Sequence, residues 1–159
     1  MDEIQNLSEN VADPGVEYGV AKKSFFAIKK LVDFSSPQFE PLIHRIYIKA
    51  IEEGVDNPKM YEEAYILLRE MIANMPKWFR LDEEEDIPYP YVWKYAEMGK
   101  LCYNLNKKKK AVEYTEKSFE ILKKIGFNNR LKEVKEMEQR MNELKISMSF
   151  EKAEAFRKS

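Results

Sequence analysis

The sequence predicts an all-α fold, and three observations support that prediction. Apolar residues recur at spacings of three and four along most of the chain, which is the pattern of amphipathic helices. The 159 residues include only five Gly, seven Pro and a single Thr, and these counts argue against a sheet-rich fold. Hydrophobic residues make up 44% of the chain, which is enough for a core without disulfide bonds.

Six helices are expected, each marked by an apolar stripe. Turn signals follow these stripes at Gly54, Pro76, Asn106 and Gly126. Asn106 is suited to the turn after the fourth helix because Asn tolerates the left-handed backbone conformation. The expected helices cover about residues 17–33, 39–54, 60–74, 91–104, 107–124 and 130–158.

Two segments lack a helical pattern. Residues 1–16 have weak periodicity and end in Asp13-Pro14-Gly15, which predicts a flexible N-terminal arm. Residues 77–90 contain five consecutive acids, Asp82 to Asp86, whose mutual repulsion favours an exposed acidic connecting loop. We expect residues 17–159 to form a single helical domain that includes this loop.

The charge is distributed unevenly along the chain. Residues 1–92 contain 10 Lys and Arg against 18 Asp and Glu, whereas residues 93–159 contain 17 against 10. The first part therefore has a net charge of −8 and the second a net charge of +7. This asymmetry is compatible with contacts inside the chain, with head-to-tail association or with an anionic partner.

Composition also limits the classes of protein. Cys102 is the only cysteine, which excludes an internal disulfide and a CxxC metal site and favours a small buried residue. No apolar run approaches the ~20 residues that span a bilayer. The chain begins Met1-Asp2-Glu3 without the basic and apolar segments of a signal peptide, so we expect no membrane partner and a cytoplasmic location. Abundant Lys and Glu with scarce Gln and Thr are typical of thermophile proteins.

Residues 95–125 carry a repeat-like pattern. Tyr95 opens the first helix, Met98-Gly99 follow one turn later, and Ala111 and Ser118 place small residues on the second helix. Small residues at these positions allow two helices to cross closely. The segment resembles one tetratricopeptide (TPR) unit, and Tyr61 to Pro76, with Ala64 at the small position, resembles the second helix of another.

The resemblance implies a right-handed array of antiparallel helical hairpins with a long C-terminal helix. It also implies a concave surface that holds a protein or peptide partner, and hence a non-enzymatic scaffold. The residues placed on that surface are Trp93, Ala96, Lys100, Tyr103 and Asn104. Ala64 and Ala111 are 47 residues apart rather than the repeat length of about 34, so a different all-helical bundle is the alternative.

A basic patch supports a second function. Lys107, Lys108, Lys109 and Lys110 open the fifth expected helix, with Tyr103 nearby. Such a patch could contact nucleic-acid phosphates while the aromatic ring stacks on a base. The alternative function is therefore a nucleic-acid-associated protein that uses its basic C-terminal half, although a solvated helix start would give the same pattern.

The sequence nominates no catalytic residue, metal ligand or cofactor site. His44 is the only histidine and lies on an apolar helix face, which favours a structural role. Asp82 to Asp86 lack the spacing and turn glycine of a calcium loop. Glycine-rich phosphate-binding motifs are absent from the sequence. We therefore expect no enzyme activity and no cofactor.

The last expected helix carries an apolar stripe at spacings of three and four. This C-terminal stripe consists of Val134, Met137, Met141, Leu144 and Met148. It is narrow, like the contact face of a coiled coil, and it is rich in adaptable Met side chains. Packing on the preceding helical hairpin is the preferred interpretation, and homodimerisation through the stripe is the alternative.

Overall fold

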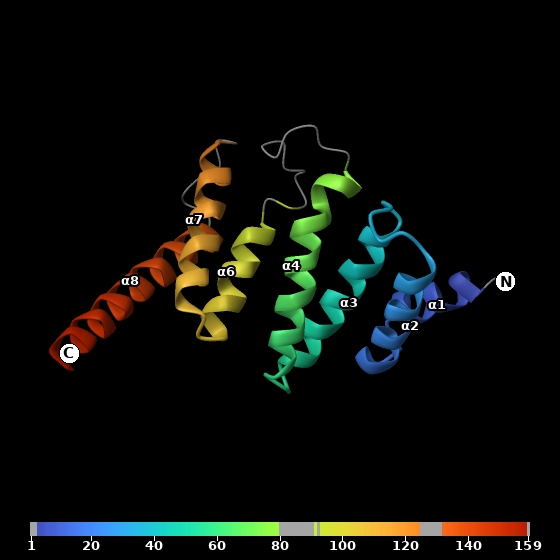
Figure 1. Cartoon of the computed structure of the whole chain (residues 1–159), viewed down its shortest axis with the longest axis horizontal. Helices are drawn as coiled ribbons and strands as arrows, with labels where there is room; N and C mark the ends of the chain where they lie inside the picture. The colour runs from blue at the N-terminus through green and yellow to red at the C-terminus, as the bar shows by residue number, and fades with distance from the viewer. Residues whose placement is uncertain (1–2, 80–90, 92, 125–131, 159) are drawn as a thin grey trace. The chain divides into compact units, whose positions relative to one another are not determined.

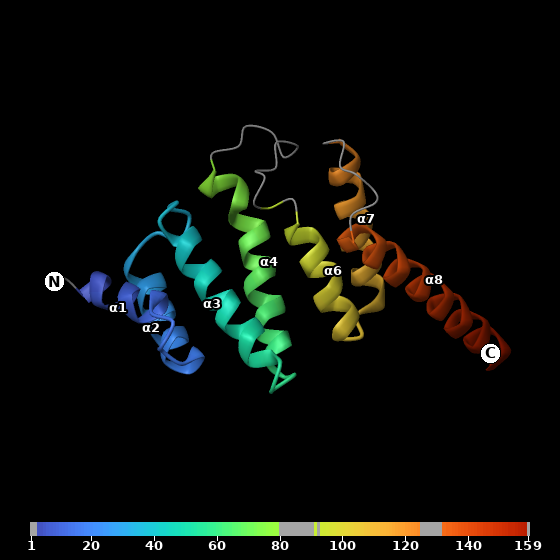
Figure 2. The same cartoon turned by 180° about the vertical axis from the view of Figure 1, so that it is seen from behind.

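A computed structural model describes residues 3–79, 91, 93–124 and 132–158, and these residues form seven helices and no strand. The all-α prediction is therefore confirmed for this part of the chain. The chain divides into two compact units, Met1–Pro88 and Tyr89–Ser159. The helices are α1 (Glu3–Ala12), α2 (Tyr18–Leu31), α3 (Phe39–Gly54), α4 (Met60–Trp78), α6 (Lys94–Asn104), α7 (Lys108–Lys124) and α8 (Lys132–Lys158) (Figures 1 and 2).

Helix α1 lies within the segment expected to be a flexible arm. It packs against α2 and α3 and buries Val11 completely. Lys49 of α3 donates hydrogen bonds to the carbonyl oxygens of Asp13 (2.6 Å) and Val16 (2.8 Å), which fixes the turn after α1. Local periodicity gave no sign of this helix because its stability comes from contacts with distant residues.

Helices α3 and α4 form the most closely packed pair of the first unit. Ala50 and Ala64 are fully buried, which allows the two backbones to approach each other. Gly54 ends α3, as the sequence predicted. A Cβ atom at this position would lie 2.6 Å from the ring of Tyr61, so the missing side chain makes room for that aromatic ring.

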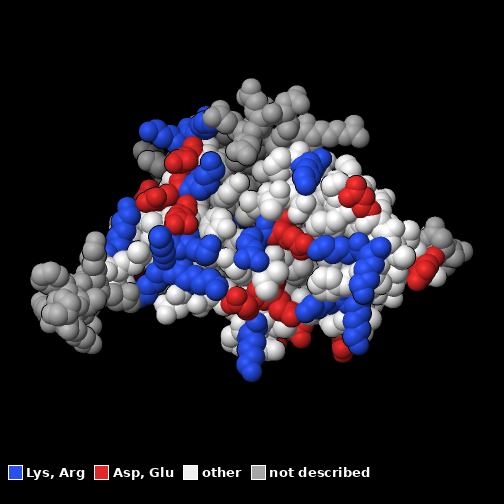
Figure 3. Space-filling view, viewed as in Figure 1, with Lys and Arg blue, Asp and Glu red and all other residues white. Residues whose placement is uncertain are grey.

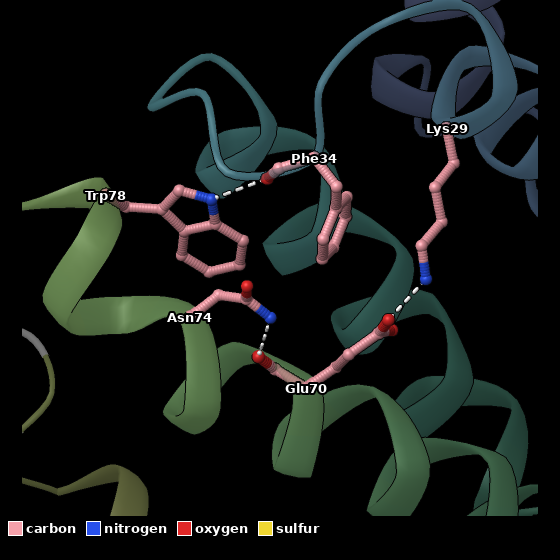
Figure 4. A network of polar contacts seen from close by, with 5 residues as sticks. All are labelled: Lys29, Phe34, Glu70, Asn74 and Trp78. Atoms are coloured by element: carbon pink, nitrogen blue, oxygen red, sulfur yellow. Dashed lines mark hydrogen bonds and ion pairs between the residues drawn. The ribbon is translucent and has the colours of Figure 1, made fainter.

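Helix α4 continues past Pro76, where the sequence predicted its end. It reaches Trp78, and the Phe79 N–H donates to the Met75 carbonyl at 3.0 Å. Trp78 is held by tertiary contacts, because its indole N–H donates to the Phe34 carbonyl at 2.9 Å and its ring meets the Phe34 ring edge-on (Figure 4). These contacts offset the free-energy cost of Pro76, which lacks a backbone N–H to donate within the helix.

Two ion pairs connect α2 to α4. Lys22 contacts Glu63 at 2.5 Å, and Lys29 pairs with Glu70 about two helical turns further along the same faces (Figure 4). Burial opposes the ionisation of Glu63, but hydrogen bonds from Lys22 and Tyr18 outweigh it and lower the pKa of Glu63. For Tyr18, burial and the hydrogen bond to Glu63 both raise the pKa of its phenol.

In the second unit, α6 and α7 form a tight hairpin. Gly99, Ala111 and Ser118 are buried, and a Cβ atom at Gly99 would overlap the Thr115 hydroxyl. The small residues thus lie at the contact for which the sequence predicted them. None of the described helices combines the length and the apolar character needed to cross a membrane.

Helix α8 packs against α7 through the C-terminal stripe. The side chains of Val134, Met137, Met141 and Leu144 are between 1% and 6% exposed within a single copy of the chain. This burial agrees with the preferred interpretation, in which the stripe packs on the preceding hairpin. Little of these four side chains remains for contact with a second copy.

Candidate partner-binding site

The second unit contains a pocket of about 500 Å³ between the α6–α7 turn and α8. Three segments supply its lining: the end of α6, the turn with the start of α7, and one face of α8. The lining residues are Tyr103, Asn104, Asn106, Lys108, Glu143, Leu144 and Ser147. We call this the turn pocket.

The α6–α7 turn is closed by a specific backbone arrangement. Asn106 has φ of 60°, and its N–H donates to the Tyr103 carbonyl at 3.1 Å. The Lys107 N–H donates to the Cys102 carbonyl at 2.8 Å, which completes a Schellman motif. The left-handed Asn predicted for this turn is therefore confirmed, and it places Asn104 and Lys108 on either side of one tight bend.

Tyr103 connects the turn to α8. Its phenol donates a hydrogen bond to Glu143 at 3.0 Å, and Gln139 donates to the other Glu143 oxygen at 3.3 Å. The hydrogen bond to Glu143 raises the pKa of the Tyr103 phenol. Tyr103 is 37% exposed, which leaves aromatic surface open at the pocket.

A second link lies across the pocket. Lys108, at the start of α7, donates to the Ser147 hydroxyl of α8 at 2.8 Å. Leu144 lies between the two α8 residues that make these links and is 3% exposed. Arg140, one turn earlier on α8, is half-buried, and burial lowers its pKa while Glu136 opposes that shift.

The turn pocket offers several kinds of contact to a bound chain. The Tyr103 ring provides an aromatic surface, and the side-chain amides of Asn104 and Asn106 can both donate and accept hydrogen bonds. Lys108 supplies a cation and Glu143 an anion. This mixture suits a peptide, because a peptide presents amides, carbonyls and side chains within a short length.

The structure brings only some of the predicted binding residues together. Tyr103 and Asn104 line the turn pocket, whereas Trp93 and Lys100 do not. Trp93 directly precedes α6 and lies ten residues before Tyr103, which corresponds to about 15 Å along the helix axis. Lys100 is exposed on the helix surface between them, and Ala96, expected on the same surface, is 8% exposed and therefore buried.

The basic patch is divided by the same turn. Lys108 belongs to the turn pocket, Lys107 is half-buried, and Lys109 and Lys110 are exposed on α7. No ion pair joins Lys109 or Lys110 to any residue that the structure describes. Figure 3 shows basic side chains gathered where the α6–α7 turn lies.

The sequence did not predict that α8 contributes residues to the turn pocket. Two hydrogen bonds join the turn to α8 over long sequence separations. Tyr103 and Glu143 are 40 residues apart, and Lys108 and Ser147 are 39 residues apart. The C-terminal stripe predicted that Leu144 lies on the packed face of the helix. Glu143 and Ser147 are close to Leu144 on the helix, so the same stripe could have predicted that they lie at the edge of that face. No motif marked them as partners of Tyr103.

The other candidate positions add no second site. Cys102 is buried, as predicted, and His44 is half-buried in α3. Within the described ranges, no three His, Cys, Asp or Glu side chains are grouped closely enough to hold a metal ion. The acidic run Asp82 to Asp86 lies outside the described residues.

Comparison with protein-family models, curated proteins and solved structures finds no match for the chain. The assignment of a function therefore depends on the turn pocket and its residues.

Proposed function

We propose that the chain is a non-enzymatic helical scaffold that binds a peptide segment of a protein partner in the turn pocket. One observation carries the proposal: Tyr103 and Asn104, selected from the repeat pattern, line a pocket of about 500 Å³ together with Lys108 and three residues of α8. Its volume lies within the range of ligand-binding clefts.

The TPR-like interpretation of the α6–α7 hairpin is part of this proposal. It is supported by the close contact of Gly99 with Thr115 and by the burial of Ala111 and Ser118. In such an array the concave surface that binds a ligand is lined by the first helix of each hairpin, which here is α6 with Tyr103 near its end. The hydrogen bond from Tyr103 to Glu143 supports the proposal because it brings α8 to the same pocket.

Affinity capture from the native host tests the proposal. The wild-type chain is compared with Tyr103→Ala/Asn104→Ala and with the matched control Glu113→Ala/Lys117→Ala, whose residues are exposed on α7 away from the pocket. We expect the wild type and the control to retain the same protein and the pocket variant to lose it. Equal retention by all three forms would refute the assignment.

Nucleic-acid binding is the second candidate, and the exposure of Lys109, Lys110 and Tyr103 favours it. Binding through phosphates weakens steeply as the salt concentration rises. Titration of a fluorescent single-stranded RNA against the wild type and Lys109→Gln/Lys110→Gln would detect it. Absence of binding at low salt would exclude this candidate and leave the peptide proposal as it stands.

A further inference from the structure

The first unit has a groove along α2 that the proposed function does not use. It has a volume of about 700 Å³ and extends from Gly19 to Leu31, with Glu3 of α1 at one end. We call it the α2 groove and define it by Glu3, Gly19, Lys23, Phe26, Lys30 and Leu31. Helix α2 covers about 18 Å over this span, which is the length of more than three helical turns.

The floor of the α2 groove is apolar and exposed. The Phe26 side chain is 42% exposed and Leu31 is 52% exposed, and Gly19 leaves open space where a side chain would stand. The Phe26 ring meets the buried Phe25 ring edge-on, with 5.8 Å between the centroids. Phe26 is therefore held in place as an anchor, and covering it with an apolar partner would remove water from both surfaces.

Cations line the rim of the same groove. Lys23 and Lys30 are exposed and are seven residues apart, so they lie on one face two helical turns apart. Neither lysine pairs with an acid among the residues that the structure describes. Lys22 also lines the groove but is paired with Glu63, and Figure 3 shows basic side chains gathered over α2.

A smaller cavity shares Phe26 and Lys22 with the α2 groove. It has a volume of about 140 Å³ and is lined mainly by apolar side chains that include Phe25, Ile46 and Ile66. Ile66 is 46% exposed at its edge. A cavity of this size and character suits one aliphatic side chain, and Phe26 lines both this cavity and the α2 groove.

We propose that the α2 groove binds an acidic amphipathic helix of a protein partner. The apolar side chains of that helix would cover Phe26 and Leu31, and its carboxylates would pair with Lys23 and Lys30. Carboxylates spaced by seven residues on a helix match the spacing of the two lysines. This inference is independent of the turn pocket, because no residue belongs to both.

Charge argues against a second copy as the occupant. Two copies that met symmetrically through this groove would bring Lys23 and Lys30 of one chain toward the same lysines of the other. Like charges at an interface oppose association. An acidic partner avoids that repulsion, because the lining of the groove holds three lysines and a single acid, Glu3.

A designed peptide tests the proposal directly. The probe is a fluorescent helical peptide of about 14 residues that carries Leu on one face and Glu on both flanks. The matched peptide replaces each Glu with Lys and keeps every Leu. We expect fluorescence anisotropy to detect binding of the acidic peptide and at least about tenfold weaker binding of the basic one.

Variants locate the binding to the α2 groove. We expect two variants, Lys23→Glu/Lys30→Glu and Phe26→Ala, each to weaken binding of the acidic peptide by at least about tenfold. The matched control is Lys59→Glu/Lys132→Glu, which changes the net charge equally at two exposed positions where helices begin. Glu is favourable at a helix N-terminus, so the control should fold and bind like the wild type.

Several results would overturn the proposal. One such result is that the acidic peptide binds the wild type and Lys23→Glu/Lys30→Glu with equal affinity. Another is that the wild type binds the acidic and the basic peptide with equal affinity. Circular dichroism confirms that each variant is folded, and Lys23→Gln/Lys30→Gln provides a milder second pair. If the wild type does not bind the peptide but self-associates, and Phe26→Ala abolishes that self-association, the occupant of the groove is a second copy of the chain. If the wild type binds single-stranded RNA and not the peptide, the occupant is a nucleic acid.

Discussion

Single small residues decide how closely the helices of the second unit pack. Gly99 is the clearest case, because a Cβ atom there would overlap the Thr115 hydroxyl and lie 3.3 Å from the Thr115 backbone nitrogen. The backbone cannot move away as easily as the end of a long side chain. The helix propensity that Ala would gain is therefore opposed by a clash in the centre of the α6–α7 hairpin.

We predict that Gly99→Ala lowers the free energy of unfolding by about 1–3 kcal/mol through overpacking. Gly19→Ala is the matched control, since a Cβ atom at Gly19 meets nothing within 4 Å. There the same substitution should leave the chain as stable or slightly more stable, by less than the ~1 kcal/mol of a helix interior, because Gly19 is the second residue of α2. Urea denaturation measures both, and a stabilised Gly99→Ala chain would contradict the close packing described for α6 and α7.

Ser118 presents the opposite situation. Its side chain is fully buried in α7, and its hydroxyl has no hydrogen-bond partner among the described residues. Burial of an unpaired hydroxyl costs free energy. We predict that Ser118→Ala raises the free energy of unfolding by about 1 kcal/mol, measured by urea denaturation. A loss of that size instead would mean that the hydroxyl is hydrogen-bonded in solution.

At the scale of helices, contacts between distant elements override local signals. Proline predicted the end of α4 at residue 76, yet the helix reaches Trp78 because Phe34 accepts the indole hydrogen bond. Helix α1 forms in a segment of weak periodicity because Val11 is buried and Lys49 holds the following turn. In both cases the deciding partner lies more than 30 residues away, beyond the reach of a local pattern.

The contact between α2 and α4 predicts a response to acid. The pKa of Glu63 is lower in the folded chain than in the unfolded chain, so its contribution to stability is present above the unfolded value and is lost as the pH falls through the folded value. Because Lys22 and Glu63 are partly exposed, the contribution is at most about 1 kcal/mol. Thermal melts between pH 7 and pH 3 should show a smaller loss of stability for Glu63→Gln than for the wild type. Identical acid dependence of the two proteins would contradict this.

At the scale of the whole molecule, the sequence predicted more of the fold than of the sites. Periodicity located six of the seven described helices, and the small residues of the α6–α7 hairpin lie where the repeat pattern placed them. The turn pocket was predicted only in part, because α8 supplies Glu143 and Ser147 from far along the chain. The α2 groove was not predicted at all. Phe26 and Leu31 lie outside the apolar stripe that identified the helix, which consists of Ala21, Phe25, Ile28 and Val32.

The most direct test of the proposed function is site-specific photocrosslinking. Asn104 lies in the turn pocket and is exposed, and Glu113 is an exposed residue of α7 outside it. Each is replaced in turn by p-benzoylphenylalanine, and the crosslinked products formed in the native host are identified by mass spectrometry. We predict that position 104 captures one peptide segment of a protein and that position 113 does not. Capture of the same products from both positions, or of none from position 104, would contradict binding in the turn pocket.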